Sequence, residues 1–546
     1  MQKTLVFFNR FKNNLYWQSR HFIFGVFHLL YLLLLYPQME STFKMDILKA
    51  TIGITPIILS IIIIVLFKRN TVTGALVGVL FGLAVITTMN WFTLDLSKLL
   101  TAVFTASILT ISAALVIVPG LYLNAVLKGQ GKIKSLSNMI KLFQLDPTHK
   151  ALLLLIAFLP AIESLTGFGV SLFLSIPLFF SLFPDHKAYR LSIIGMNIMP
   201  WGTLALATIV GASLSQEPVN QLSATTALTS LFVFPTFGLI GAYIVDGIEG
   251  IKHNLFLALT MGLGLSGMLC IFSFIGLTEL AGVLSGLTVG IITLSILNKH
   301  QKKSKTSHRK SINISELFKL LAPYSMLLIL ILASRGIQPV SEFLSSVVIL
   351  QTSRIKFAVF STPGVFVGIV AAVWYFLEKV KISHLAILNK SKTTCLSLFL
   401  FAFLAQLMQE SGMLNAFSSF VSSISQGKAM YMFITPALGM LSGNITGSNV
   451  GGNALMMTLQ QSIGASLDNG LLFAAMQNSA AGFAVFTSSA IVVLTMTIAK
   501  NFERNSVVSE HQLVSFGLKS AFFIYLALIL GFWTTSLIIS NISSST

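Results

Sequence analysis

The chain has 546 residues, of which 55% are hydrophobic and only 10% are charged. A soluble domain usually carries about 25% charged residues, so this chain cannot build a water-soluble surface. The composition therefore excludes an ordinary soluble protein and predicts an all-α polytopic membrane protein, because a helix satisfies its own backbone groups inside lipid.

The formal net charge of +18 comes mostly from short basic connections between apolar segments. These connections are Lys68-Arg69, 128–134, 299–310 and 379–392. Such loops obey the positive-inside rule and face anionic lipid headgroups. No aromatic residues interleave with the basic runs, so we expect the lipid bilayer as a partner and no nucleic acid.

Residues 1–44 are predicted to be an N-terminal extension with an optional extra span. The basic residues Arg10, Lys12 and Arg20 precede the apolar run 22–36, as in a signal peptide, but no small-residue cleavage site follows. Met45 directly precedes a clean membrane start, so translation from Met1 and from Met45 both remain open.

Apolar segments long enough to span a bilayer follow one another along the rest of the chain, because a span needs about 20 apolar residues. The candidates are 51–67, 73–91, 101–127, 150–183, 188–213, 222–245, 253–275, 278–297, 315–334, 337–350, 356–377, 394–411, 428–445, 452–499 and 513–540. Two of them, 150–183 and 452–499, are too long for one crossing. We therefore predict about 12–15 transmembrane segments.

A basic stretch at 299–313 divides the chain into two halves, 45–298 and 314–546. The excess of Lys and Arg places this linker in the cytoplasm. The halves match at a constant offset, with Thr166-Gly167 on Thr446-Gly447 and Met196 on Met476. We expect two transmembrane repeats of inverted topology.

Each half contains one apolar segment that glycine and polar residues interrupt, AIESLTGFGVSLFLSIP (161–177) and MLSGNITGSNVGGNALMMTLQQS (440–462). Such backbone is tolerated at membrane depth only where protein buries it or where it lines a watery cavity. We expect a re-entrant hairpin or broken helix in each half, with tips that bind substrate together. The candidate substrate-binding residues are Ser164, Thr166, Gly167, Gly169, Ser171, Asn444, Thr446, Gly447, Ser448, Asn449 and Asn453. The alternative is a small-residue face for helix packing.

Four further residues complete the candidate site. Glu163 is an acidic residue at membrane depth and is predicted to carry a proton; a neutral structural role is the alternative. Asn197 and Asn478 follow the two interruptions at nearly equal distances and are predicted to face the same cavity. Arg335 ends an apolar segment and either contacts an anionic substrate or marks the membrane boundary.

The same motifs resemble the L-lactate permease family. The matching stretches are FLPAIESLTGFGVS (158–171), LAPYSMLLILILASR (321–335), ESGML (410–414), LSGNITGSNVGGNALMMTLQ (441–460) and AAMQNSAAG (474–482). This sequence departs from the family pattern at 164–166, at Ser171 and at Asn449, as a divergent member would. The resemblance implies a bacterial inner-membrane symporter for L-lactate or a related 2-hydroxy-monocarboxylate such as glycolate.

We therefore expect a secondary transporter that imports a small monocarboxylate with H⁺ by alternating access. A different organic anion, coupling to Na⁺, and a polytopic membrane enzyme are the alternatives. The enzyme is disfavoured because GLSG (264–267) has no histidine at membrane depth to activate Ser266. Cys270 and Cys395 form no metal-binding pattern and no phosphate-binding loop occurs, so we expect no metal and no cofactor. Homo-oligomerisation is left open.

Overall fold

The computed structural model describes residues 41–129, 145–166, 170–301, 314–423, 427–503 and 508–545. Almost all of these residues are helical, which confirms the prediction of an all-α polytopic membrane protein. Residues 1–40 and most of the basic linker lie outside the described chain, so the predictions about the extra span and the cytoplasmic linker stay predictions.

The first half contributes helices from α2 to α13, which include one π-helical turn (η1) and one 3₁₀ turn (η2). Their bounds are α2 (Ser41–Val65), α3 (Thr71–Thr88), α4 (Leu96–Gly129), α6 (Pro147–Leu153), η1 (Leu154–Phe158), α7 (Leu159–Thr166), α8 (Val170–Leu182), α9 (Asp185–Ile194), η2 (Met199–Trp201), α10 (Gly202–Ser215), α11 (Val219–Thr229), α12 (Val233–Phe274) and α13 (Thr278–Gln301).

The second half contributes α14 to α23 and one small β-hairpin. The bounds are α14 (Ile314–Gly336), α15 (Gln338–Ser346), β1 (Ile349–Gln351), β2 (Lys356–Ala358), η3 (Val359–Ser361), α16 (Pro363–Glu378), α17 (His384–Glu410), α18 (Met413–Ser423), α19 (Gly427–Thr446), α20 (Asn449–Ser466), α21 (Gly470–Ala484), η4 (Val485–Thr487), α22 (Ser489–Ala499) and α23 (Glu510–Ser545). The two strands pair antiparallel, with Leu350 opposite Phe357.

Among the described residues, nine helices are long and apolar enough to cross a membrane, or up to eleven if each of two bent helix pairs is one span. Three further apolar helices, Leu172–Leu182, Pro363–Glu378 and Ser489–Ala499, are too short to cross alone. Short apolar helices next to breaks are what interrupted spans produce.

The element α12 consists of two helices that meet at Asp246 and Gly247, whose backbone angles are not helical, as the separate candidates 222–245 and 253–275 predicted. Pro235 of the first helix packs against Gly262 of the second, and Gly238 packs against Ala258. One predicted span differs in the structure. The candidate 337–350 is no straight span, because the chain bends by 88° between α14 and α15 and then enters β1. Sequence hydropathy measures how apolar a stretch is, and it does not show where the helix axis turns.

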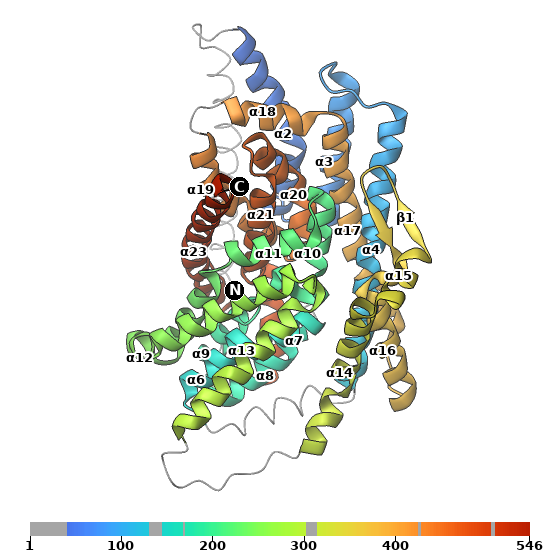
Figure 1. Cartoon of the computed structure of the whole chain (residues 1–546). Coiled ribbons are helices and arrows are strands. Elements are labelled where there is room, and N and C mark those ends of the chain that lie inside the picture. The colour runs from blue at the N-terminus through green and yellow to red at the C-terminus, as the bar shows by residue number, and fades with distance from the viewer. Residues whose placement is uncertain are drawn as a thin grey trace, which may run out of the picture.

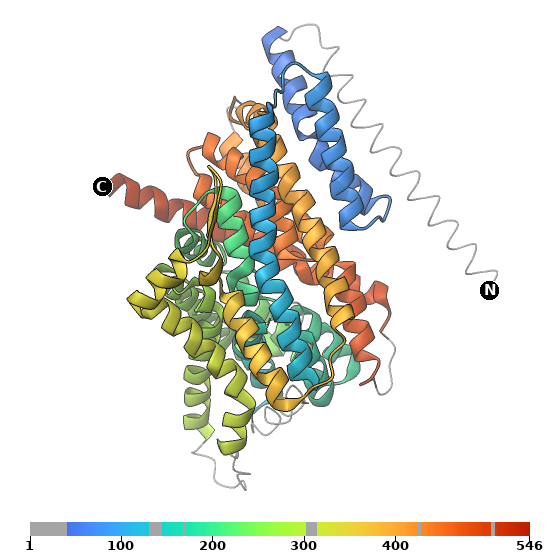
Figure 2. The ribbon, with the colours of Figure 1, turned by 90° about the vertical axis from the view of Figure 1, so that its right-hand side faces the viewer.

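The long helices α4 and α17 lie side by side along most of their length, and the α2–α3 hairpin packs beside them (Figure 2). Next to them, α10, α11, α20 and α21 form the interior of the molecule (Figure 1). Among the candidate spans of the described chain, the one formed by α21 and η4 (Gly470–Thr487) is the most buried. In it, 89% of the residues are buried inside the protein. Polar side chains on α21 are therefore shielded from lipid.

Candidate functional site

The first predicted break lies between α7 and α8. After the π-helical turn η1, α7 carries Glu163 and Ser164 into the interior, where both side chains are fully buried. The helix ends at Thr166 and α8 begins at Val170. Gly167 and Gly169, and the side chains of Thr166 and Ser171, lie outside what the structure describes, so their substrate contacts stay predictions.

The second break lies between α19 and α20. Gly447 has a φ of +62°, a left-handed conformation that favours glycine, and it turns the chain between the two helices. The Ser448 hydroxyl caps α20 by accepting a hydrogen bond from the Gly451 backbone N–H. The Thr446 hydroxyl donates to the carbonyls of Ser442 and Ser448, each at 2.8 Å. The glycines and hydroxyls of this motif therefore build the break itself.

A third interruption lies between α9 and α10. α9 ends at Ile194, and the pair α9 and η2–α10 is bent by 52°. Thr203, Leu204 and Ala205 all have φ values between 50° and 56°. Left-handed backbone costs roughly 1–2 kcal/mol for each non-glycine residue, so this segment is strained.

Five polar side chains from four helices meet beside this strained segment. Asn478 of α21 accepts hydrogen bonds from Asn453 at 2.8 Å and from Asn449 at 3.2 Å, both on α20. Its amide nitrogen donates to Thr208 of α10 at 3.0 Å and to Thr226 of α11 at 3.2 Å. We call these five residues the asparagine cluster. All five are buried, so the cluster is a hydrogen-bonded polar island inside an apolar protein.

The asparagine cluster also holds the strained segment. Asn453 donates to the Ala207 carbonyl at 3.0 Å and Asn449 to the Met199 carbonyl at 3.4 Å. The Thr208 hydroxyl donates to the Pro200 carbonyl at 2.6 Å. Within the described chain, Oδ1 of Asn449 and Oδ1 of Asn453 have no hydrogen-bond partner. Two buried acceptors are thus available to a hydroxyl or another donor.

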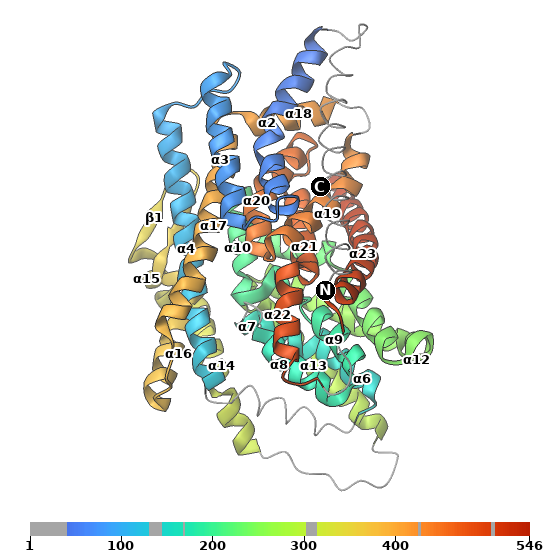
Figure 3. The same ribbon diagram turned by 180° about the vertical axis from the view of Figure 1, so that it is seen from behind.

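The two predicted breaks approach the same region from opposite sides. The position where a Gly447 side chain would begin is 3.2 Å from the Ser488 hydroxyl, which caps α22. In turn, α22 packs along α8, which begins directly after the first break (Figure 3). On the other side, Ser164 and Trp201 both lie against Gly282. The segment around Met199 and Trp201 therefore contacts residues next to both breaks.

Three helices, α8, α20 and α22, begin at or beside these breaks. A helix N-terminus presents free backbone N–H groups and a partial positive charge, which favour an anion. No lysine or arginine is among the buried residues of the described chain, whereas Glu163 is. An anion bound here would be held by backbone N–H groups and amides. Next to Gly447, Ser489 and Ala490 are exposed on the protein surface.

Several predicted residues lie elsewhere. Asn197 donates to the Leu155 carbonyl at 2.7 Å, and so it braces η1 instead of hydrogen bonding to the described side chains of the asparagine cluster. Asn444 donates to Thr487 of η4 at 2.8 Å, beside the second break. Arg335 forms an ion pair with Glu279 at 2.5 Å and donates to the Ser361 carbonyl at 2.9 Å. Its guanidinium is therefore already occupied by protein acceptors.

Sequence reasoning missed Thr208, Thr226 and Gln477. Threonines are common in apolar helices, so the first two gave no signal. Gln477 is adjacent to Asn478 in AAMQNSAAG, and two consecutive amides in an apolar run were a usable signal. Its amide nitrogen donates to the Ser442 hydroxyl at 3.0 Å and to the Gly452 carbonyl at 3.2 Å, which ties α21 to α19 and α20.

Comparison with known proteins agrees with this architecture. The family model described as L-lactate permease matches residues 49–540, which is most of the chain. The chain belongs to the L-lactate permease family. A protein of Streptococcus iniae named L-lactate permease is 21% identical over 435 residues, covering 76% of this chain and 90% of that protein.

Membership of the L-lactate permease family makes this chain a multi-pass membrane transporter and not an enzyme. The buried Ser266 hydroxyl donates to the carbonyls of Ser230 and Leu231, at 3.4 and 3.5 Å. Within the described residues no group of three or more His, Cys, Asp or Glu side chains could hold a metal ion.

Proposed function

We propose that this protein imports a small 2-hydroxy-monocarboxylate, L-lactate or glycolate, together with a proton, across a bacterial inner (plasma) membrane. The observation that carries the proposal is the asparagine cluster, an uncharged and buried polar site between two helix breaks. Membership of the L-lactate permease family supports lactate as the solute class. The Streptococcus iniae relative is also named L-lactate permease.

The proposed mode of binding follows from the two kinds of group at the site. The carboxylate is stabilised by backbone N–H groups at the beginning of α20 and α22, since helix N-termini favour negative charge. The 2-hydroxyl donates to Oδ1 of Asn449 or Asn453, the buried acceptors that have no partner in the described chain. A solute without that hydroxyl leaves the acceptor unpaired, which costs about 1–3 kcal/mol.

The proposed proton carrier is Glu163. Its side chain is fully buried, and it lies three residues before the end of α7 at the first break. A charged carboxylate is costly at membrane depth. Glu163 is therefore expected to be protonated and neutral while access to the site changes from one side of the membrane to the other. Binding of an anion and a proton together keeps the transported complex neutral.

The proposed moving part is the strained segment between α9 and α10. Three consecutive left-handed residues persist only where surrounding contacts hold them, and here the asparagine cluster supplies those contacts. Binding of a solute to Asn449 and Asn453 can therefore change the hydrogen bonds that keep this segment in its left-handed conformation, as alternating access requires.

The test is uptake of radiolabelled L-lactate by proteoliposomes that contain the purified protein. An inside-alkaline pH gradient should drive accumulation, a Na⁺ gradient alone should not, and collapse of the pH gradient with a protonophore should abolish it. Accumulation driven by Na⁺ alone would replace the proton in the proposal, and accumulation of neither L-lactate nor glycolate would overturn it.

A further inference from the structure

A large apolar groove lies away from the asparagine cluster, between α9, α12 and α23. Its volume is about 1180 Å³. The lining includes Leu239 and Tyr243 of α12 and Phe523, Leu526 and Leu530 of α23, and the last two are 42% and 56% exposed. None of the residues assigned to the transport site lines it. The transport mechanism leaves this groove without a role.

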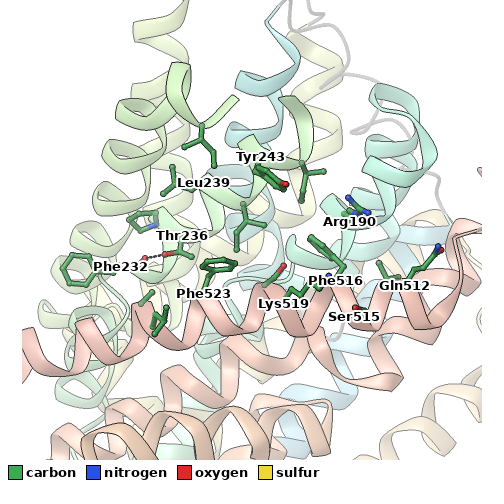
Figure 4. Close-up of a pocket in the computed structure, with 18 of the residues that line it drawn as sticks. Arg190, Phe232, Thr236, Leu239, Tyr243, Gln512, Ser515, Phe516, Lys519 and Phe523 are labelled. Carbon is green, nitrogen blue, oxygen red and sulfur yellow. Dashed lines mark hydrogen bonds between the residues drawn. The ribbon is translucent and has the colours of Figure 1, made fainter. Parts of the chain in front are cut away.

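The groove is polar at one end only. Figure 4 shows Arg190, Gln512 and Ser515 toward one end, and Phe232 and Thr236 toward the other, with Lys519 and Phe523 between them. His186 on α9 and His511 on α23 also line it, and the described lining contains no carboxylate. The polar end therefore attracts an anion.

The two charged side chains of the lining, Arg190 at the polar end and Lys519 next to it, are free to meet a ligand. Arg190 lies over the Phe516 ring, with 5.5 Å between its guanidinium carbon and the ring centroid. Neither Arg190 nor Lys519 has an ion pair or a hydrogen bond with the described chain. The acidic residues nearest along the chain, Asp185 and Glu510, do not line the groove, and Glu503 accepts a hydrogen bond from the Tyr189 hydroxyl at 2.6 Å.

The apolar part has the length of one lipid leaflet. From Lys519 to Leu530, α23 rises about 16 Å at 1.5 Å per residue. Half of a bilayer's hydrocarbon core is about 15 Å thick. Both α12 and α23 are candidate membrane spans, so this face meets acyl chains in the bilayer.

We propose that this groove is a binding site for an anionic phospholipid. The phosphate lies against Arg190 and Lys519, and one acyl chain lies along the apolar face of α12 and α23. A second, smaller hollow on α23 shares His511, Ser515 and Lys519 with the groove and continues to Leu518 and Phe522. A lipid with one headgroup and two acyl chains matches two hollows that share one basic border. Basic pockets between membrane helices bind anionic headgroups in the same way.

The experiment measures lipid binding by native mass spectrometry and thermal shift on the full-length protein in detergent. Phosphatidylglycerol should bind and raise the melting temperature, and phosphatidylcholine of the same acyl chains should do so much less. The double variant Arg190→Gln with Lys519→Gln should weaken phosphatidylglycerol binding by roughly thirtyfold, since two basic contacts are lost. The single variant Lys519→Gln should weaken phosphatidylglycerol binding by roughly fivefold, and it replaces the double variant in the test if that variant does not fold.

The matched control is Lys68→Gln with Arg69→Gln, which removes two exposed positive charges from the loop after α2. It should retain the affinity of the unmodified protein. Equal binding of both lipids would show a purely apolar contact and overturn the proposal. So would stabilisation by inorganic phosphate alone, which would reveal an anion site without a lipid. An unchanged affinity in both groove variants would also contradict it.

Discussion

Asn478 makes four hydrogen bonds, and each of its two amide atoms serves two partners. Asn478→Leu keeps the approximate size but leaves four buried polar groups short of a partner. Each such group costs about 1–3 kcal/mol, so we expect a large loss of thermal stability and of transport. Thr226→Val removes one of the four partners and should cost about a quarter as much. Equal melting temperatures for Asn478→Leu and the unmodified protein would show that the cluster does not hold α10, α11, α20 and α21 together.

Glu163 is the residue on which proton coupling rests. Glu163→Gln imitates the neutral protonated carboxyl and cannot release a proton. We expect loss of uptake driven by a pH gradient, with exchange of internal for external L-lactate retained, because exchange requires no net proton movement. The control Glu249→Gln removes a carboxyl whose side chain is 64% exposed and should behave as the unmodified protein. Full accumulation by Glu163→Gln under a pH gradient would remove Glu163 from the mechanism.

Arg335 distinguishes an ion pair from a substrate contact. Because it is paired with Glu279 at 2.5 Å, Arg335→Gln should lower stability by leaving that partly buried carboxylate unpaired. The double variant Arg335→Gln with Glu279→Gln should recover part of the loss. If Arg335 held the substrate instead, the KM for L-lactate would rise similarly in the single and double variants while stability changed little.

At the scale of elements, the sequence predicted the places where helices break better than the contacts between them. Glycines and asparagines in apolar surroundings indicated the breaks after Thr166 and Thr446. The helix α19 ends at Thr446, and residues 167–169 lie outside the described chain. Asn197 and Asn478 follow the two breaks at nearly equal distances, yet only Asn478 joins the asparagine cluster. Their partners come from helices far away in the sequence, and no local pattern encodes that choice.

Part of the second interrupted segment (440–462) serves close helix packing, which was the alternative to substrate binding. A side chain at Gly443 would begin 1.9 Å from the Ala481 carbonyl oxygen, so this glycine lets α19 approach α21. We expect Gly443→Ala to destabilise the protein by about 1–3 kcal/mol through overpacking, measured by thermal unfolding in detergent. Gly267 on α12 has nothing within 4 Å of such a side chain, so Gly267→Ala should be neutral or slightly stabilising. Equal effects of the two substitutions would contradict close packing of α19 on α21.

In the whole molecule, the proposed transport function requires that two breaks from different halves of the chain share one aqueous pocket. Among the described residues, the structure connects them through neighbours: Gly447 lies by Ser488, and α22 packs on α8. The proposed inverted symmetry of the two halves goes beyond these contacts and stays a prediction. A solute bound in the pocket should shield residues beside both breaks.

Cysteine protection measures this directly. Cys270 and Cys395 are first replaced by alanine, and Ser489→Cys then places a thiol at an exposed position beside Gly447. Ser295→Cys, exposed on α13, is the control. We predict that a water-soluble thiol reagent modifies the thiol introduced by Ser489→Cys, and that L-lactate slows this reaction at concentrations near its KM for uptake, with no effect on the control. A reaction rate at position 489 that L-lactate leaves unchanged, in protein that still takes up L-lactate, would contradict a binding site at the helix breaks.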